Sequence, residues 1–189
     1  MIDSLCDGAG EQNATIACFY FDFAAQKELS ITNIMGALVK QLVSGLEETP
    51  EEISRAYREQ RGAVGGRRPL LSDIVKMLQT ASSKKRTFIC IDALDECAVG
   101  HLVKLLDSLN QVLQKSPRTR IFVTGRPHIR SEIRRFLEGR VANVSISPKR
   151  DDIIRYLRSR LHEDTTRDAM DSSLEASILK KIPEDVSEM

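Results

Sequence analysis

The most informative segment of the chain reads Phe88-Ile-Cys-Ile-Asp92-Ala-Leu-Asp95-Glu96. Four apolar residues lead directly to Asp92, and two further carboxylates follow within a turn. In open α/β sheets, ligands bind in the crevice at the carboxyl ends of the strands. We therefore interpret residues 87–92 as a strand that brings Asp92 to the ligand-binding rim of a parallel sheet.

The three carboxylates at this strand end have two interpretations. Acids this close repel one another, which is easiest to explain if a cation lies among them. Mg²⁺ prefers oxygen ligands and keeps several waters, and a second carboxylate beyond the strand end can orient an attacking water. Alternatively, the strand precedes a solvated helix N-terminus, where Asp95 and Glu96 interact favourably with the helix dipole. The spacing leaves both interpretations open.

Polar residues also follow a second predicted strand, in the segment Ile121-Phe-Val-Thr124-Gly125-Arg126-Pro127. An apolar strand here presents a hydroxyl and then a guanidinium in a tight turn. Arginine suits a developing phosphate charge because its planar fork offers several donors. The alternative is an ordinary surface arginine before a helix that begins at proline.

Strands and helices alternate along the chain. Strands are also predicted at residues 15–23, 120–124 and 141–146, and the first is apolar enough to be buried on both faces of a sheet. Helices are predicted at residues 31–46, 70–81, 99–114 and 128–138, with another beginning at Thr49. This alternation favours right-handed crossovers in a doubly wound α/β sheet. After Pro148, helices at 151–162 and 172–182 indicate a helical appendage.

Composition narrows the classes of function. Hydrophobic residues make up 41% of the 189, and the formal net charge is +1, so nothing global indicates a nucleic-acid or membrane-surface partner. No apolar run approaches the roughly 20 residues that span a bilayer. A nucleic-acid-binding domain would rest on one basic helix, and the few aromatic residues weaken that hypothesis. Its candidate residues are Arg126, Arg130, Arg134 and Arg135.

The four cysteines do not form a recognisable metal or disulfide pattern. Cys18 and Cys90 lie in strongly apolar segments, where cysteine behaves as a small buried hydrophobic residue. No two cysteines are spaced as CxxC, and the three histidines are scattered. We therefore expect reduced thiols and a cytoplasmic protein.

The two strand ends together carry a family resemblance. Ile89-Cys-Ile-Asp92-Ala-Leu-Asp95-Glu96-Cys97 resembles the Walker B segment of NACHT-type STAND P-loop NTPases. It is most similar to fungal ankyrin- and WD-repeat receptors and to nephrocystin-like N-terminal domains. Val123-Thr-Gly-Arg126-Pro127 resembles their sensor-1 strand, which more often has serine where this chain has Gly125. The resemblance extends through residues 19–23, 38–42 and 152–157 and covers nearly all of the chain.

This resemblance implies roles for individual residues. Asp92 would be the magnesium-side carboxylate, and Asp95 with Glu96 would be the hydrolytic or water-orienting pair. Arg126 would sense the γ-phosphate, supported by Thr124. The implied cofactor is Mg²⁺ with ATP or GTP. The implied partners are that nucleotide in the full-length protein, other domains of the same receptor and oligomer partners, without nucleic acid or membrane.

The phosphate-binding loop of such a family, G-x-x-x-x-G-K-[ST] opening a helix, does not occur in these 189 residues. The glycine-rich residues 62–68 follow no predicted strand and have Arg-Arg-Pro where Lys-Ser/Thr is required. Gly8-Ala-Gly10 fails for the same reason. The opening residues 1–5 resemble the tail of the helix that follows the loop, so we expect a chain that begins just after its P-loop helix.

The predicted fold is therefore α/β, a three-layer P-loop NTPase-like parallel sheet missing its P-loop strand. This core would span residues 12–148, and a helical domain would start at 149–189. The resemblance implies that the missing strand would lie between the strands at 120–124 and 141–146.

Two functional hypotheses follow. The first is a partial nucleotide-binding switch domain of a STAND signalling receptor, of NTPase lineage but inactive as this chain because the phosphate loop is absent. The alternative is a non-enzymatic fragment that serves as a structural or protein-interaction module and binds no nucleotide in any buffer.

Overall fold

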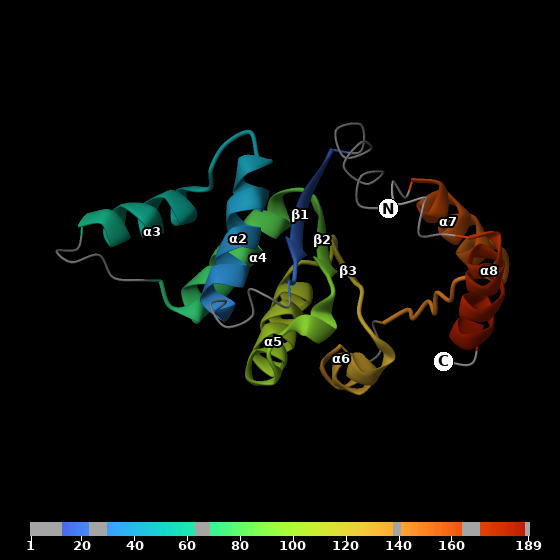
Figure 1. Ribbon diagram of the computed structural model, residues 1–189. Coiled ribbons are helices and arrows are strands. Elements are labelled where there is room, and N and C mark those ends of the chain that lie inside the picture. The colour runs from blue at the N-terminus through green and yellow to red at the C-terminus, as the bar shows by residue number, and fades with distance from the viewer. Residues whose placement is uncertain (1–12, 23–29, 63–68, 138–140, 164–170, 188–189) are drawn as a thin grey trace. The chain divides into compact units, whose positions relative to one another are not determined.

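The computed structural model describes residues 13–22, 30–62, 69–137, 141–163 and 171–187. Within them, three parallel strands form one sheet in the order β1-β2-β3. Their bounds are β1 Ala14–Tyr20, β2 Arg86–Asp92 and β3 Thr119–Val123 (Figure 1). The predicted α/β class with a parallel sheet is confirmed.

The helices follow the predicted alternation closely. Before β2 lie α2 (Ile31–Ser44), α3 (Glu51–Gly62) and α4 (Leu71–Lys84). A short 3-10 helix, η2 (Leu94–Glu96), and α5 (Val99–Lys115) connect β2 to β3. Beyond β3 come the 3-10 helix η3 (Pro127–Ile129), α6 (Arg130–Phe136), α7 (Arg150–Glu163) and α8 (Ser172–Ser187).

The hydrophobic core lies on one face of the sheet. Strand residues Ala17, Ile89 and Ile91 belong to one buried cluster with the apolar faces of α2, α4 and α5. Figure 1 shows these three helices grouped beside the sheet. In α2, apolar residues recur every three or four positions, which gives the helix one buried face, and the Ser30 hydroxyl caps it by accepting the Asn33 N–H.

The opposite face of the sheet carries the alternate strand residues, among them Ile16, Cys18, Phe88, Cys90 and Phe122. None of these five residues belongs to the buried cluster, although Phe88 and Cys90 are themselves buried. The predicted three-layer, P-loop NTPase-like arrangement therefore stays a prediction.

β1 is less buried than the sequence predicts. Thr15 and Ala17 are buried, but the alternate residues are partly exposed and Tyr20 is largely exposed. The expectation of burial on both faces is thus only half right, because β1 is an edge strand of the described sheet, whereas β2 lies between two neighbours. The last residue predicted for this strand, Phe23, lies outside the described residues.

The Gln41 side chain of α2 occupies the free edge of β1. Its Oε1 accepts the backbone N–H of Cys18 at 2.9 Å, and its Nε2 donates to the Cys18 carbonyl at 2.9 Å. One amide side chain thus satisfies the two backbone groups that a neighbouring strand would otherwise satisfy. It fixes β1 against α2 at the level of Cys18.

The strand predicted at residues 141–146 is wrong. Residues 141–149 have no regular secondary structure, and Val144 and Ile146 are 79% and 88% exposed. An apolar alternation forms a strand only when another strand supplies backbone partners, and the described sheet consists of β1, β2 and β3 alone.

The chain divides into two compact units, Met1–Val141 and Ala142–Met189. The predicted domain ranges, 12–148 and 149–189, stay a prediction. The second unit contains α7 and α8, which confirms the two helices expected after Pro148. Among the described residues, no helix is long and apolar enough to cross a membrane.

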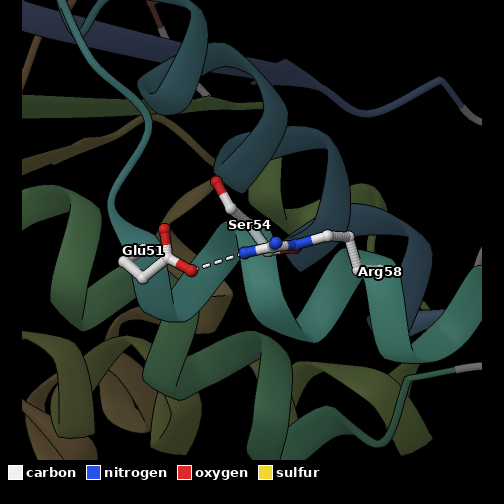
Figure 2. Close-up of polar contacts among 3 residues, drawn as sticks. All are labelled: Glu51, Ser54 and Arg58. Carbon is white, nitrogen blue, oxygen red and sulfur yellow. Dashed lines mark hydrogen bonds and ion pairs between the residues drawn. The ribbon is translucent and has the colours of Figure 1, made fainter.

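Helix α3 illustrates an ordinary solvated surface. Arg58 reaches back along the helix to the Glu51 carboxylate, and its Nε donates to the Ser54 carbonyl at 3.4 Å (Figure 2). The side chains of Glu51 and Arg58 are both exposed, and such pairs contribute little to stability. The glycine-rich residues 63–68, and residues 1–12 with Gly8, Gly10 and Cys6, lie outside the described residues.

Candidate functional site

The chain reverses sharply after β2. Ala93 has φ 51° and ψ 46°, which is the left-handed region that non-glycine residues rarely adopt. Leu94 follows in η2 and is completely buried in the core. Burial of Leu94 anchors the turn to the core, and the turn separates Asp92 at the end of β2 from Asp95 in η2.

Thr124 joins the end of β3 to this bend through both its backbone and its side chain. Its N–H donates to the Ile91 carbonyl at 3.0 Å, and its carbonyl accepts the Leu94 N–H at 2.9 Å. Its hydroxyl accepts the Ala93 N–H at 3.0 Å and donates to Oδ1 of Asp92. The Thr124 hydroxyl therefore fixes the rotamer of Asp92 and supplies the hydrogen-bond acceptor for the Ala93 N–H in the left-handed turn.

Asp95 and Arg126 form the second link between the two strand ends. Asp95 Oδ1 accepts the backbone N–H of Arg126 at 3.2 Å, and Oδ2 lies 3.4 Å from Arg126 Nε. The Asp95 side chain is only 8% exposed, whereas that of Arg126 is 77% exposed. The carboxylate is thus built into the turn, and the guanidinium projects from it into solvent.

Gly125 permits this approach. A Cβ atom at this position would lie 2.6 Å from Ile129 Cδ1 and 3.3 Å from Asp95 Oδ1. The first contact is too close, and Ile129, at the end of η3, would have to shift. Glycine at this position therefore lets the turn after β3 lie against Ile129 and Asp95 without displacing either side chain.

The acid cluster expected from the sequence is divided between two partners. Asp95 pairs with Arg126, and Asp92 accepts a hydroxyl from Thr124, so these contacts account for two of the three neighbouring acids. Across the described ranges, no group of three or more His, Cys, Asp or Glu side chains is placed to hold a metal ion. A magnesium site of the nucleotide type needs fewer protein ligands, because substrate phosphates and waters supply the rest.

Asp92 fits that more limited role. Its Oδ1 is engaged by Thr124, and among the described residues Oδ2 has no hydrogen-bond or ion-pair partner. Asp92 is only half-buried at the strand end. One oriented carboxylate oxygen at the rim of a parallel sheet is suited to hold a magnesium-bound water.

The comparison with known families covers this site. The family described as Nephrocystin 3, N-terminal matches residues 1–126, which include all three strands and the turn from Thr124 to Arg126. The chain belongs to this family. No curated protein and no solved structure matches the chain. The match to the nephrocystin 3 N-terminal family confirms the nephrocystin-like part of the resemblance, and α7 and α8 lie beyond it.

Within this nephrocystin 3 N-terminal chain, four of the five predicted site residues meet at one place. They form the pairs Asp92–Thr124 and Asp95–Arg126. Glu96 lies in the same 3-10 helix as Asp95 and is half-buried, and its role stays a prediction. Sequence reasoning missed Ala93, whose N–H ties the bend to Thr124, because no residue pattern marks an alanine for a left-handed conformation.

Proposed function

We propose that this chain forms part of the nucleotide-dependent switch of a NACHT-type STAND P-loop NTPase in a cytoplasmic signalling receptor. The observation that carries the proposal is the pair of links Asp92–Thr124 and Asp95–Arg126. They lie at the carboxyl ends of two neighbouring parallel strands, where nucleotides bind in open α/β sheets. ATP or GTP would bind at this edge of the sheet, and its hydrolysis would reset an oligomerising conformational switch in the receptor.

In this proposal, Asp92 holds a magnesium-bound water through the oxygen that Thr124 does not engage. The ion would neutralise charge on the β- and γ-phosphates of ATP or GTP. Arg126 contacts the γ-phosphate through its solvent-facing guanidinium, which Asp95 orients by holding the backbone N–H and Nε. Asp95 thereby becomes a positioning residue, and Glu96 is the carboxylate that orients the attacking water.

A phosphate-binding loop is essential for this function. None of the G-x-x-x-x-G-K-[ST] type occurs in the 189 residues, so this function requires a loop contributed by further residues of a longer polypeptide. The test compares the 189-residue chain with a polypeptide that also contains the residues encoded upstream. Binding of fluorescent ATP and GTP derivatives is measured with and without Mg²⁺.

We expect the longer polypeptide to bind nucleotide in a magnesium-dependent manner. Asp92→Ala should abolish the magnesium dependence. Asp107→Ala, which removes an exposed carboxylate on α5, should leave it unchanged. Magnesium-dependent binding that is unaltered by Asp92→Ala would overturn the assignment.

The second candidate is a structural or protein-interaction module without nucleotide chemistry. It draws support from the mutual neutralisation of Asp95 and Arg126, which leaves their contact complete without a phosphate. On this hypothesis neither polypeptide binds nucleotide, with or without Mg²⁺. The same binding experiment therefore separates the two candidates.

A further inference from the structure

Cys18 and Cys90 are direct neighbours across the sheet. They are register partners in the parallel pair β1–β2. Adjacent strands lie about 4.8 Å apart, and the side chains of register partners lie on the same face. The flanking pairs Ala17–Ile89 and Phe19–Ile91 face the core. The two thiols therefore lie side by side on the opposite face, outside the buried cluster.

The two thiols differ in exposure. Cys90 is 2% exposed and lies between Cys18 on one side and Phe122 on the other. Cys18 is partly exposed, and Gln41 holds its backbone through two bonds of 2.9 Å. Neither cysteine is in a disulfide. Cys18 is thus the more exposed of the two residues, and the shielded Cys90 lies beside it.

We propose that Cys18 and Cys90 form a dithiol modification site that hydrogen peroxide converts into a reversible cross-strand disulfide. The Cys18 sulfur attacks one peroxide oxygen, and the O–O bond breaks to give a sulfenic acid and water. The Cys90 sulfur then attacks the Cys18 sulfur, and the sulfenic hydroxyl leaves as water with the Cys90 proton. The sum is two thiols and one peroxide giving one disulfide and two waters.

The backbone geometry permits this bond. The spacing of about 4.8 Å between neighbouring strands lies within the range of about 4.4–6.8 Å observed between Cα atoms joined by a disulfide. Register partners whose side chains stand parallel hold their Cβ atoms about as far apart as the strands, roughly 4.8 Å, which is slightly beyond the roughly 3.5–4.5 Å between the Cβ atoms of a disulfide. The sheet must therefore adjust slightly. Such strained disulfides are readily reduced, which makes the modification reversible.

The site is next to the carboxyl rim but does not depend on nucleotide binding. Cys90 precedes Asp92 by two residues, so both lie on the same face of β2. A disulfide at Cys18–Cys90 would tie the edge strand β1 covalently to β2 immediately before the acidic bend. The inference goes beyond the proposed function and would survive its failure.

The test treats the native chain with hydrogen peroxide in a Cys6→Ser background, because Cys6 lies outside the described residues. Intact mass and non-reducing peptide mapping identify the product. We expect the loss of two hydrogen atoms, a cross-link between the peptides that contain Cys18 and Cys90, and full reversal by dithiothreitol. Cys97→Ser should form the same cross-link, because burial shields Cys97 from reaction.

Two variants examine the order of events. Cys90→Ser should stop at a sulfenic acid on Cys18 that dimedone traps, and Cys18→Ser should be protected from oxidation because Cys90 is shielded. If either variant fails to fold, the mapping of the Cys6→Ser chain alone decides the question. Oxidation of Cys18 to sulfinic acid while Cys90 stays reduced, or no reaction at either residue, would overturn the proposal.

Discussion

Asp95 uses both carboxylate oxygens on Arg126, one on the backbone N–H at 3.2 Å and one on Nε at 3.4 Å. The two residues are 31 positions apart in sequence and lie beyond the ends of neighbouring strands. The contact therefore joins two turns that the sequence presents as independent. It explains why an acidic residue is tolerated at a site that is only 8% exposed.

Asp95→Ala is expected to lower the free energy of unfolding by about 1–3 kcal/mol, because it removes a carboxylate bonded to two donors. Asp95→Asn keeps an acceptor for the Arg126 N–H and should lose less. Urea-induced unfolding of the chain measures both changes. An Asp95→Ala variant as stable as the parent chain would show that the contact does not hold the turn.

Arg58→Ala provides a matched surface control. The Arg58–Glu51 pair is exposed on both sides, so its removal should change the free energy of unfolding by less than about 1 kcal/mol. The same unfolding measurement applies. A loss equal to that of Asp95→Ala would contradict the view that burial of the carboxylate distinguishes the two pairs.

Thr124→Val should lower stability by about 1–2 kcal/mol, since it removes the acceptor of the Ala93 N–H and the donor to Asp92 without changing side-chain shape. Thr124→Ser keeps the hydroxyl and should restore most of the loss. Chemical denaturation of the three proteins tests this. Equal destabilisation by valine and serine would show that the methyl group matters instead of the hydrogen bonds.

Ala93→Gly is expected to raise stability by roughly 0.5–1 kcal/mol. The left-handed conformation costs an L-residue about 1–2 kcal/mol, and the greater freedom of glycine in the unfolded chain offsets part of the gain. Ala37→Gly in the middle of α2 is the control and should lower stability by about 0.5–1 kcal/mol. If both changes are destabilising, the strain at Ala93 is negligible.

The buried thiol of Cys97 should make the stability of the chain depend on pH in the alkaline range. Burial raises the pKa of this thiol from 9.0 to about 11. The unfolded chain therefore releases this proton at a lower pH than the folded chain does. The stabilisation from the neutral thiol is complete below pH 9 and is lost as the pH rises towards 11. Urea midpoints measured across this window should fall less steeply in Cys97→Ala than in the parent chain.

Much of the architecture could be predicted from local pattern. The apolar periodicity of α2 and the apolar runs of β2 and β3 predicted the positions of these elements correctly. In each of them, the apolar pattern is regular enough to bury one face. The strand predicted at residues 141–146 failed because a strand also requires a partner, which local sequence does not reveal. The environment of β1 was misjudged for the same reason, since its edge position depends on strand order.

The sequence by itself determined the α/β class, the positions of Asp92 and Arg126 at strand ends, and the membership of a nephrocystin 3 N-terminal family over residues 1–126. These features depend on residue order and local periodicity. Only the tertiary structure decided how the acids are used: Thr124 engages Asp92, Arg126 engages Asp95, and Cys18 lies beside Cys90. The physical reason is that parallel pairing brings distant residues into contact, more than 30 positions apart between the ends of β2 and β3 and more than 70 between β1 and β2. No local pattern specifies the register of that pairing.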